Sequence, residues 1–138
     1  MIVRQLEDLE RQGAVVRGET WTSRRLLLAR DGMGFSLHDT ILAASSVTRM
    51  RYENHLEAVY CVQGEGQLDD LDAGRVHPIE PGTLYALDRH DRHVLRAMTE
   101  LRMVCVFSPP LVGPEAHDAS GSYPLLTPTD ELDGKARR

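Results

Sequence analysis

Short apolar segments alternate along the chain with glycine, proline, aspartate and asparagine at intervals of roughly ten residues. This rhythm is typical of strands separated by turns, and it predicts an all-β protein built as a barrel or a sandwich. Residues 5–12 alone suggest a helix, because Val3, Leu6 and Leu9 recur at threefold spacing, which supports one or two turns at most. The expected strands are residues 2–4, 24–29, 34–44, 57–64, 75–79, 83–88, 93–97 and 100–109.

Strand periodicity sorts the polar side chains by face, because alternate residues of a strand point to opposite sides of a sheet. A closed barrel with histidine, glutamate, tyrosine and threonine among the apolar residues of its inner face predicts a ligand cavity. The residues expected to share a face are Ser36, His38 and Thr40 in one strand, Glu57, Val59 and Cys61 in a second, with His55 if no bulge intervenes, and Thr83, Tyr85 and Leu87 in a third.

The length of 138 residues fits one domain. We expect a barrel over residues 1–124. The sequence after Tyr123, PLLTPTDELDGKARR, is proline-rich and charged with little to bury, and residues 125–138 are expected to form a mobile tail.

Charge and composition narrow the classes of partner. The net charge is −5, and the lysines and arginines are scattered, which argues against nucleic acid because phosphate neutralisation needs clustered basic side chains. There is no charged-then-apolar leader and no apolar run of about 18 residues, so we expect neither secretion nor a membrane span, and a cytoplasmic location. Cys61 and Cys105 lie inside apolar segments, which predicts buried free thiols.

The spacing of several polar residues resembles the two metal-binding motifs of the cupin superfamily, G-x5-H-x-H-x3,4-E-x6-G and G-x5-P-x-G-x2-H-x3-N. Glu57 and Gly64 match the second half of the first motif, and Gly82 and His93 match the glycine-to-histidine distance of the second. The resemblance implies a cupin barrel, a double-stranded β-helix or jelly roll, with a degenerate first motif. The positions of its two histidines hold Arg51 and Glu53, or Met50 and Tyr52 under the longer spacing, and Asp88, His90 and Ala97 occupy the other positions of the second motif.

A metal bound to such a chain would need a ligand in place of the missing histidines. Glu57 and His93 offer one oxygen and one nitrogen, and Tyr85 could supply a phenolate, because a nearby cation lowers the pKa of a phenol. This donor set suits Fe(II), with Mn(II) or Zn(II) as substitutes. Equally, Tyr85 could simply pack in the barrel with its hydroxyl hydrogen-bonded.

Five longer segments carry a closer resemblance, namely MIVR (1–4), YENHLEAVYCVQGEG (52–66), IEPGTLYALDRHDRHVLRA (79–97), VCVFSPPLVGPEAH (104–117) and GSYP (121–124). Together they resemble one family, the ectoine synthases, which are cupin-fold enzymes of compatible-solute biosynthesis. The resemblance covers the chain to about Pro124 and implies cyclocondensation of N-γ-acetyl-L-2,4-diaminobutyrate to ectoine, with loss of water. It also implies iron on Glu57, Tyr85 and His93, a C-terminal segment folded over the barrel mouth, and a head-to-tail homodimer, in keeping with the exposed edge strands of small barrels.

The same resemblance places Tyr52 and His55 in the substrate pocket, with His55 as a proton carrier because its ordinary pKa is near neutral. An exposed loop is the alternative for both. Trp21 and Arg25 could hold the substrate amine and carboxylate by cation–π and ionic contacts, although a lone tryptophan is also an ordinary core residue. His38 and Thr40 match pocket positions of the family, and position 38 can hold a different polar residue in relatives.

Later residues have similarly paired interpretations. Asp91 could orient His93 or a proton, or it could belong to a turn. Phe107 is expected to border the pocket, and Cys105, on the same face, is expected to pack in the core. Glu115, as an acceptor of the amine proton, and His117 are expected late in the pocket, the alternative being a solvated loop. His77 and His90 are expected on the surface.

Two other functions remain open from the sequence. A small cupin can bind a sugar or an amino acid without chemistry, and the altered first motif is compatible with that function. An iron-dependent dioxygenase would use the same metal, but the missing histidines weaken that interpretation. The clustered ionisable residues favour the condensation over simple binding.

Overall fold

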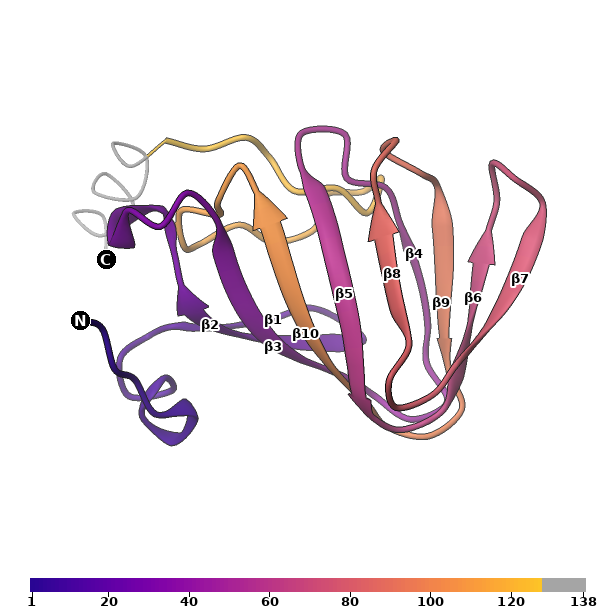
Figure 1. Cartoon of the computed structure of the whole chain (residues 1–138), viewed down its shortest axis with the longest axis horizontal. Helices are drawn as coiled ribbons and strands as arrows, with labels where there is room; N and C mark the ends of the chain where they lie inside the picture. Colours follow the sequence, from indigo (N-terminus) through magenta and orange to yellow (C-terminus); the bar gives the residue numbers. More distant parts are fainter. Residues whose placement is uncertain (128–138) are drawn as a thin grey trace.

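The apolar segments assemble into two antiparallel β-sheets in a computed structural model that describes residues 1–127. A six-stranded sheet has the order β1-β2-β3-β10-β5-β8, and a four-stranded sheet has the order β4-β9-β6-β7 (Figure 1). The strands are β1 (Val15–Arg17), β2 (Trp21–Leu27), β3 (Ser36–Leu42), β4 (Val47–Met50), β5 (Leu56–Gln63), β6 (Gly66–Asp70), β7 (Arg75–Ile79), β8 (Leu84–Leu87), β9 (His93–Ala97) and β10 (Leu101–Ser108). Short 3₁₀ turns are η1 (Leu6–Asp8) and η2 (Ala29–Asp31).

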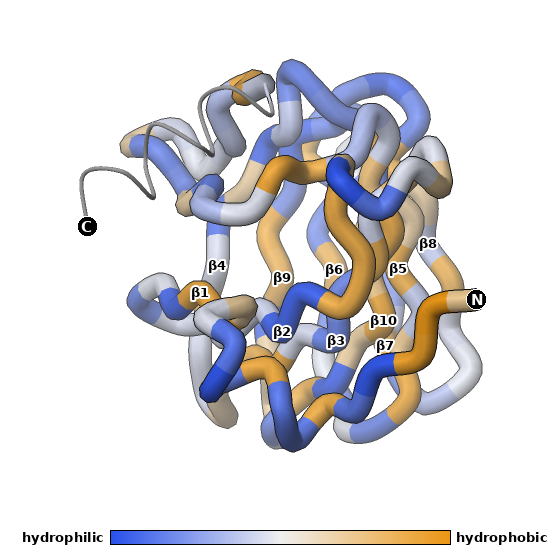
Figure 2. The backbone as a smooth tube through the Cα atoms, turned by 90° about the vertical axis from the view of Figure 1, so that its left-hand side faces the viewer, coloured by the Kyte–Doolittle hydropathy of each residue, from blue (hydrophilic) through white to orange (hydrophobic). Residues whose placement is uncertain are grey.

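The hydrophobic core lies between the two sheets. Apolar positions are concentrated in the strands and hydrophilic ones at the turns (Figure 2). Leu101, Leu111, Met103 and Leu95 are each at most 1% exposed within this core. Burial of such side chains contributes about 1.5–3 kcal/mol each, so the core between the sheets is the main source of stability.

Strand pairing carries one inner face across the six-stranded sheet. His38 pairs with Cys105, which pairs with Val59, which pairs with Tyr85. Phe107 pairs with Glu57 in the neighbouring row. Side chains directly opposite one another in an antiparallel pair lie on the same face, so the polar residues that share a face within each strand form one continuous surface.

Ten strands form among the described residues where the pattern predicts eight, because β1, β4 and β6 are missed and residues 2–4 form none. The acidic β6 is the instructive case, since aspartate is a poor strand former. Its Asp69 accepts a hydrogen bond of 2.9 Å from Arg96 on the adjacent β9. Tertiary pairing thus stabilises a strand that local preference does not indicate.

The remaining expectations about organisation have mixed outcomes. The short helical turn near the N-terminus is confirmed by η1, and both cysteines are buried and free. No helix in residues 1–127 is long and apolar enough to cross a membrane. Residues 128–138, most of the expected tail, lie outside the described residues.

The segment that follows β10 has no strand or helix over residues 109–127. It runs back across one end of the two sheets, coloured orange to yellow in Figure 1. Its Leu111, Val112 and Tyr123 are at most 4% exposed, so this segment is packed into the fold.

Gly64 explains why a glycine closes the strand that carries Glu57. Its φ is +96°, a backbone conformation that residues other than glycine rarely adopt. A Cβ at this position would also overlap the Glu100 carbonyl oxygen and lie 3.1 Å from the Leu101 Cα. We expect Gly64→Ala to lower the free energy of unfolding by about 3 kcal/mol, since backbone strain and a steric overlap combine.

Urea unfolding of the purified variant measures this loss. Gly74→Ala is the matched control, because Gly74 also has a positive φ of +66°. A Cβ at Gly74 would have no atom of residues 1–127 within 4 Å beyond its chain neighbours. Equal losses in the two variants would show that the overlap with residue 100 contributes nothing.

Candidate active site

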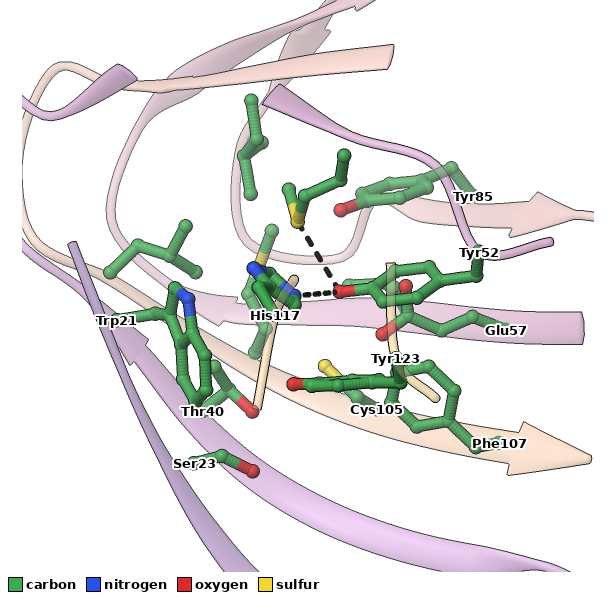
Figure 3. A pocket seen from close by; sticks show the side chains of 15 residues that line it. Trp21, Ser23, Thr40, Tyr52, Glu57, Tyr85, Cys105, Phe107, His117 and Tyr123 are labelled. Carbon is green, nitrogen blue, oxygen red and sulfur yellow. Dashed lines mark hydrogen bonds between the residues drawn. The ribbon is translucent and has the colours of Figure 1, made fainter. Parts of the chain in front are cut away.

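A buried pocket lies between the sheets, with side chains from both of them and from the C-terminal segment (Figure 3). Its cavity volume is about 30 Å³, which is room for about two water molecules. The lining residues are Trp21, Ser23, Thr40, Leu42, Met50, Tyr52, Glu57, Val59, Tyr85, Leu95, Met103, Cys105, Phe107, His117 and Tyr123. The pocket therefore lies where the strand faces predict a ligand cavity.

The Tyr52 hydroxyl makes two side-chain hydrogen bonds in the pocket. It is hydrogen-bonded to His117 Nε2 at 2.8 Å and donates to Met50 Sδ at 3.4 Å (Figure 3). Burial raises the pKa of Tyr52, and burial lowers the pKa of His117 to about 4. At neutral pH the pocket therefore contains a protonated phenol next to a neutral imidazole.

The Glu57 carboxyl faces the same pocket from β5 and is 7% exposed. Burial raises its pKa to about 8, while a hydrogen bond with Cys105 lowers it. Burial and the nearby Glu57 charge raise the pKa of Tyr85. Without a cation both groups are therefore protonated near neutral pH, and a bound cation would favour their ionised forms.

His93 has one ring nitrogen engaged and one without a partner. Its Nδ1 donates a hydrogen bond of 2.9 Å to the Asp91 carbonyl, since a carbonyl can only accept. Its buried Nε2 has no hydrogen-bond partner within residues 1–127. A histidine whose Nδ1–H is fixed in this way presents an Nε2 lone pair, which is the arrangement found in metal-ligating histidines.

Tyr85 connects Glu57 with His93. It lines the buried pocket together with Glu57, and a neighbouring cavity of about 370 Å³ together with His93 and Asp91. The ring centroids of Tyr85 and His93 are 6.3 Å apart. Within residues 1–127 no three histidine, cysteine, aspartate or glutamate side chains could hold a metal ion. A site here would therefore require a donor of another type, and the Tyr85 phenol fits that requirement.

Arg25 and Glu115 lie outside the pocket lining, contrary to the expectation that both face the substrate. The Arg25 guanidinium donates to the carbonyls of Gly113 at 2.5 Å and Glu115 at 2.6 Å. The Glu115 carboxylate accepts from the backbone N–H groups of Val112 and Gly113, each at 2.7 Å. Both side chains are at most 1% exposed, so the solvated-loop alternative for Glu115 is wrong as well. Their donors and acceptors hold the C-terminal segment on the barrel.

The expectation that His38 lines the pocket is also corrected. Its ring lies between Ser23 Oγ at 3.5 Å from Nδ1 and Ser36 Oγ at 2.8 Å from Nε2. Ser36 Oγ in turn accepts a hydrogen bond from the Leu111 N–H at 2.9 Å. His38 therefore belongs to a buried hydrogen-bond chain that leads from the pocket wall to the C-terminal segment.

His55 is buried behind the pocket rather than in an exposed loop. It does not line the cavity, and its ring centroid is 5.9 Å from Phe107 and 6.5 Å from Tyr123. Its Nδ1 has no hydrogen-bond partner, and burial lowers the pKa of this histidine. For His55 to carry a proton to a ligand in the pocket, the neighbouring rings of Phe107 and Tyr123 would have to move.

The structure places Trp21, Thr40, Tyr52, Phe107 and His117 in the pocket as expected. It adds residues that the sequence analysis did not select, or assigned to the core, namely Ser23, Cys105 and Tyr123. Tyr123 stacks on Tyr52 with ring centroids 5.1 Å apart. In the sequence, Tyr123 stands out only as an aromatic residue in the coil segment GSYP. That pattern does not show that the segment folds back onto the barrel and brings Tyr123 to the pocket.

The two histidines without an assigned role differ. His77 is exposed on β7, as expected. His90 is half-buried, which corrects the expectation of a surface position, and its Nδ1 donates to the Tyr52 carbonyl at 2.7 Å. Asp91 also accepts a hydrogen bond from the Arg89 N–H at 3.3 Å, which supports its turn interpretation, while its carbonyl fixes His93.

Comparison with known proteins adds to this geometry. A family model described as ectoine synthase matches residues 1–127. The L-ectoine synthase of Desulfatibacillum aliphaticivorans is 59% identical over 128 residues, covering 91% of this chain and 98% of that protein. The crystal structure of ectoine synthase from P. lautus is 53% identical, with a TM-score of 0.82 and coverage of 93% of this chain and 92% of that chain.

A more distant structural neighbour bears on the fold alone. The cupin domain of an XRE-family transcriptional regulator from Enterobacter cloacae has a TM-score of 0.55 at 14% identity, covering 67% of this chain and 99% of that chain. The architecture is therefore that of a cupin, as the two motif halves predict. Together with the family match over all the described residues, these findings show that the chain belongs to the ectoine synthase family.

Proposed function

We propose that this chain catalyses the ring closure of N-γ-acetyl-L-2,4-diaminobutyrate to the compatible solute ectoine. The observation that carries the proposal is its family match, with 59% identity to a curated L-ectoine synthase. In this reaction the α-amine attacks the carbonyl carbon of the acetamido group. A C–N bond forms, the C–O bond breaks, and the oxygen leaves as water with both hydrogens of the neutral amine. The product is a six-membered cyclic amidine.

The buried donors support a metal-dependent form of this lyase chemistry. Glu57, Tyr85 and His93 would hold Fe(II), with Mn(II) or Zn(II) as alternatives. The unpartnered Nε2 of His93 and the carboxyl of Glu57, whose pKa burial raises to about 8, support this donor set. A bound cation would act as a Lewis acid and polarise the acetamido carbonyl.

The aromatic residues of the pocket suit the folding of a flexible substrate. The rings of Tyr52, Phe107 and Tyr123 lie with pairwise centroid distances of 5.1 to 5.5 Å. A close-fitting wall of this kind holds the amine against the carbonyl and removes the entropic cost of ring closure from the chemical step. It also excludes water, which would otherwise favour hydrolysis of the product.

The Tyr52 hydroxyl is the pocket's best-placed proton donor. It remains protonated at neutral pH because burial raises its pKa, and its hydrogen bonds with Met50 Sδ and His117 Nε2 hold the oxygen in place. A phenol held in this way can donate a proton to the departing oxygen. Ser23 and Thr40 supply hydroxyl groups in the same pocket for the charged ends of the substrate.

Proton NMR tests the proposed reaction directly. The iron-loaded protein would be incubated anaerobically with N-γ-acetyl-L-2,4-diaminobutyrate, with a metal-stripped sample as the control. Iron-dependent appearance of ectoine resonances is expected. Unchanged substrate in both samples, together with substrate binding in a parallel titration, would instead establish a non-catalytic binding protein.

We also propose that the protein is a homodimer that uses the outer face of β5 and β8. Leu56, Tyr60 and Leu84 are exposed by 44%, 47% and 64%, respectively. The strand β8 is an edge of the six-stranded sheet, so its outer backbone groups are unpaired within that sheet. In a symmetric dimer, a second copy of the chain would cover both these apolar side chains and the free edge of β8.

Leu84→Asp is expected to convert the dimer into a monomer, because a carboxylate would be buried in an apolar interface. Size-exclusion chromatography with light scattering measures the mass of the particle. Val76→Asp is the control, since Val76 is 60% exposed on β7 of the other sheet. A native protein with the mass of one chain would contradict the dimer, and a dimeric Leu84→Asp variant would contradict this interface.

A further inference from the structure

An open groove lies on the protein surface next to the buried pocket. Its volume is about 420 Å³, and it is bounded by the β1–β2 turn, β4 and the C-terminal segment. Its charged and hydroxyl-bearing lining residues are Arg17, Glu19, Thr20, Thr48, Arg49 and Asp118. Charged groups of both signs and two threonine hydroxyls make this groove suitable for a zwitterionic amino acid.

Trp21 and His117 are the side chains that line both the groove and the buried pocket. Their ring centroids are 4.8 Å apart with an interplanar angle of 53°. In Figure 3 the His117 ring lies between the Trp21 indole and the Tyr52 hydroxyl, to which it is hydrogen-bonded. Because both rings line the pocket and the groove, they form the wall between the two.

Part of the pocket lining must move for a ligand of substrate size to enter, and this wall is the part that borders the surface groove. The cavity of about 30 Å³ holds about two water molecules, far less than the volume of an acetylated diamino acid. Opening the wall would join the pocket to the 420 Å³ groove.

Gly18 provides the space in which the Trp21 indole lies. The Gly18 N–H donates to the Trp21 carbonyl at 2.9 Å and closes the β1–β2 turn, directly after the last paired residues, Arg17 and Thr22. A Cβ at Gly18 would lie 2.7 Å from Trp21 Cζ2 and still closer to Cε2 and Nε1. The indole thus covers a position where only hydrogen fits.

We propose that Gly18 is a positioning residue for the reaction: its bare Cα gives the Trp21 indole the room to act as a movable wall, and the groove is the substrate's entrance. The identity of the ligand rests on the proposed function, whereas the position of the wall does not. Gly18 lines the groove and not the pocket, so a side chain there would push the indole from the groove side towards the pocket.

Gly18→Ala tests this role, and Trp21 is the only tryptophan of the chain, so its fluorescence reports on the wall alone. We expect a changed emission maximum and acrylamide quenching constant in the metal-stripped variant, without any substrate. With the iron-loaded variant we expect the association rate of ectoine, followed by stopped-flow fluorescence, to fall at least tenfold. Gly74→Ala, where a Cβ meets nothing within 4 Å, is the control and should match the native protein.

Further variants separate positioning from a loss of stability. In a Trp21→Phe background, Gly18→Ala should change KM for the acetylated substrate less than twofold, because the smaller ring leaves room for the methyl group. Ala119→Phe narrows the groove from an exposed position that does not line the pocket, and it should raise KM several-fold with kcat unchanged.

Native fluorescence and native association rates in Gly18→Ala would overturn the inference. If that variant fails to fold, an unchanged KM in Ala119→Phe would overturn it. Absence of turnover in the native protein would refute the proposed reaction but would leave the fluorescence result valid.

Discussion

Replacing His93 by alanine is expected to remove bound iron and to lower turnover more than 100-fold. The reason is that His93 Nε2 is buried without a protein partner, while Nδ1 is fixed by the Asp91 carbonyl. Changes to groups that merely support metal ligands cost about 10–100-fold in affinity or activity, so the loss of a ligand should cost more. Metal analysis of the purified protein and the NMR assay measure the two effects.

His77→Ala is the matched control, because His77 is exposed on β7 and should keep full iron content. Glu57→Ala should behave like His93→Ala, whereas Tyr85→Phe tests the phenolate separately. Full metal retention in His93→Ala or Glu57→Ala would refute the assignment of that ligand. Unchanged iron affinity in Tyr85→Phe would restore the interpretation that Tyr85 only packs in the barrel.

Arg25→Ala is expected to lower the free energy of unfolding by about 3–5 kcal/mol, because it leaves buried acceptors and the Glu115 carboxylate without their cation. The guanidinium is fully buried, with hydrogen bonds to the carbonyls of Gly113 and Glu115. Urea unfolding measures the loss. Turnover should fall with it, because Tyr123 and His117 reach the pocket on the segment that Arg25 holds.

Arg24→Ala is the control for this prediction. Arg24 is the adjacent residue on β2, its side chain is 24% exposed, and it pairs with Asp39. We expect its loss to cost about 1 kcal/mol, as for a partly exposed ion pair. A fully stable Arg25→Ala variant with a raised KM would show instead that Arg25 binds the substrate carboxylate, as the family resemblance implies.

The sequence predicts the barrel and its inner face well, because both depend on periodicity. Thr40 and Cys105 lie on the face that the alternation of their strands dictates, and pairing of neighbouring strands then aligns Glu57 and Tyr85 within one pocket. Side-chain direction within a strand is a local property, so one strand at a time suffices to predict it.

Positions in irregular segments are not local in this sense. From the sequence, Glu115 is expected to be solvated or to face the substrate. In the structure its carboxylate accepts hydrogen bonds from two backbone N–H groups of its own segment, and it lies beside Arg25, 90 residues away along the chain. Tyr123 reaches the pocket only because residues 109–127 fold back over the barrel. Contacts of this kind depend on the whole fold, and the residue pattern near Glu115 or Tyr123 does not encode them.

The most direct test of the central claim is anomalous diffraction at the iron edge from crystals of the iron-loaded protein. We expect one iron peak at bonding distance from a Glu57 carboxylate oxygen, the Tyr85 hydroxyl oxygen and His93 Nε2, next to the buried pocket. An iron peak held by other side chains, or a Tyr85 hydroxyl directed away from the metal, would contradict it.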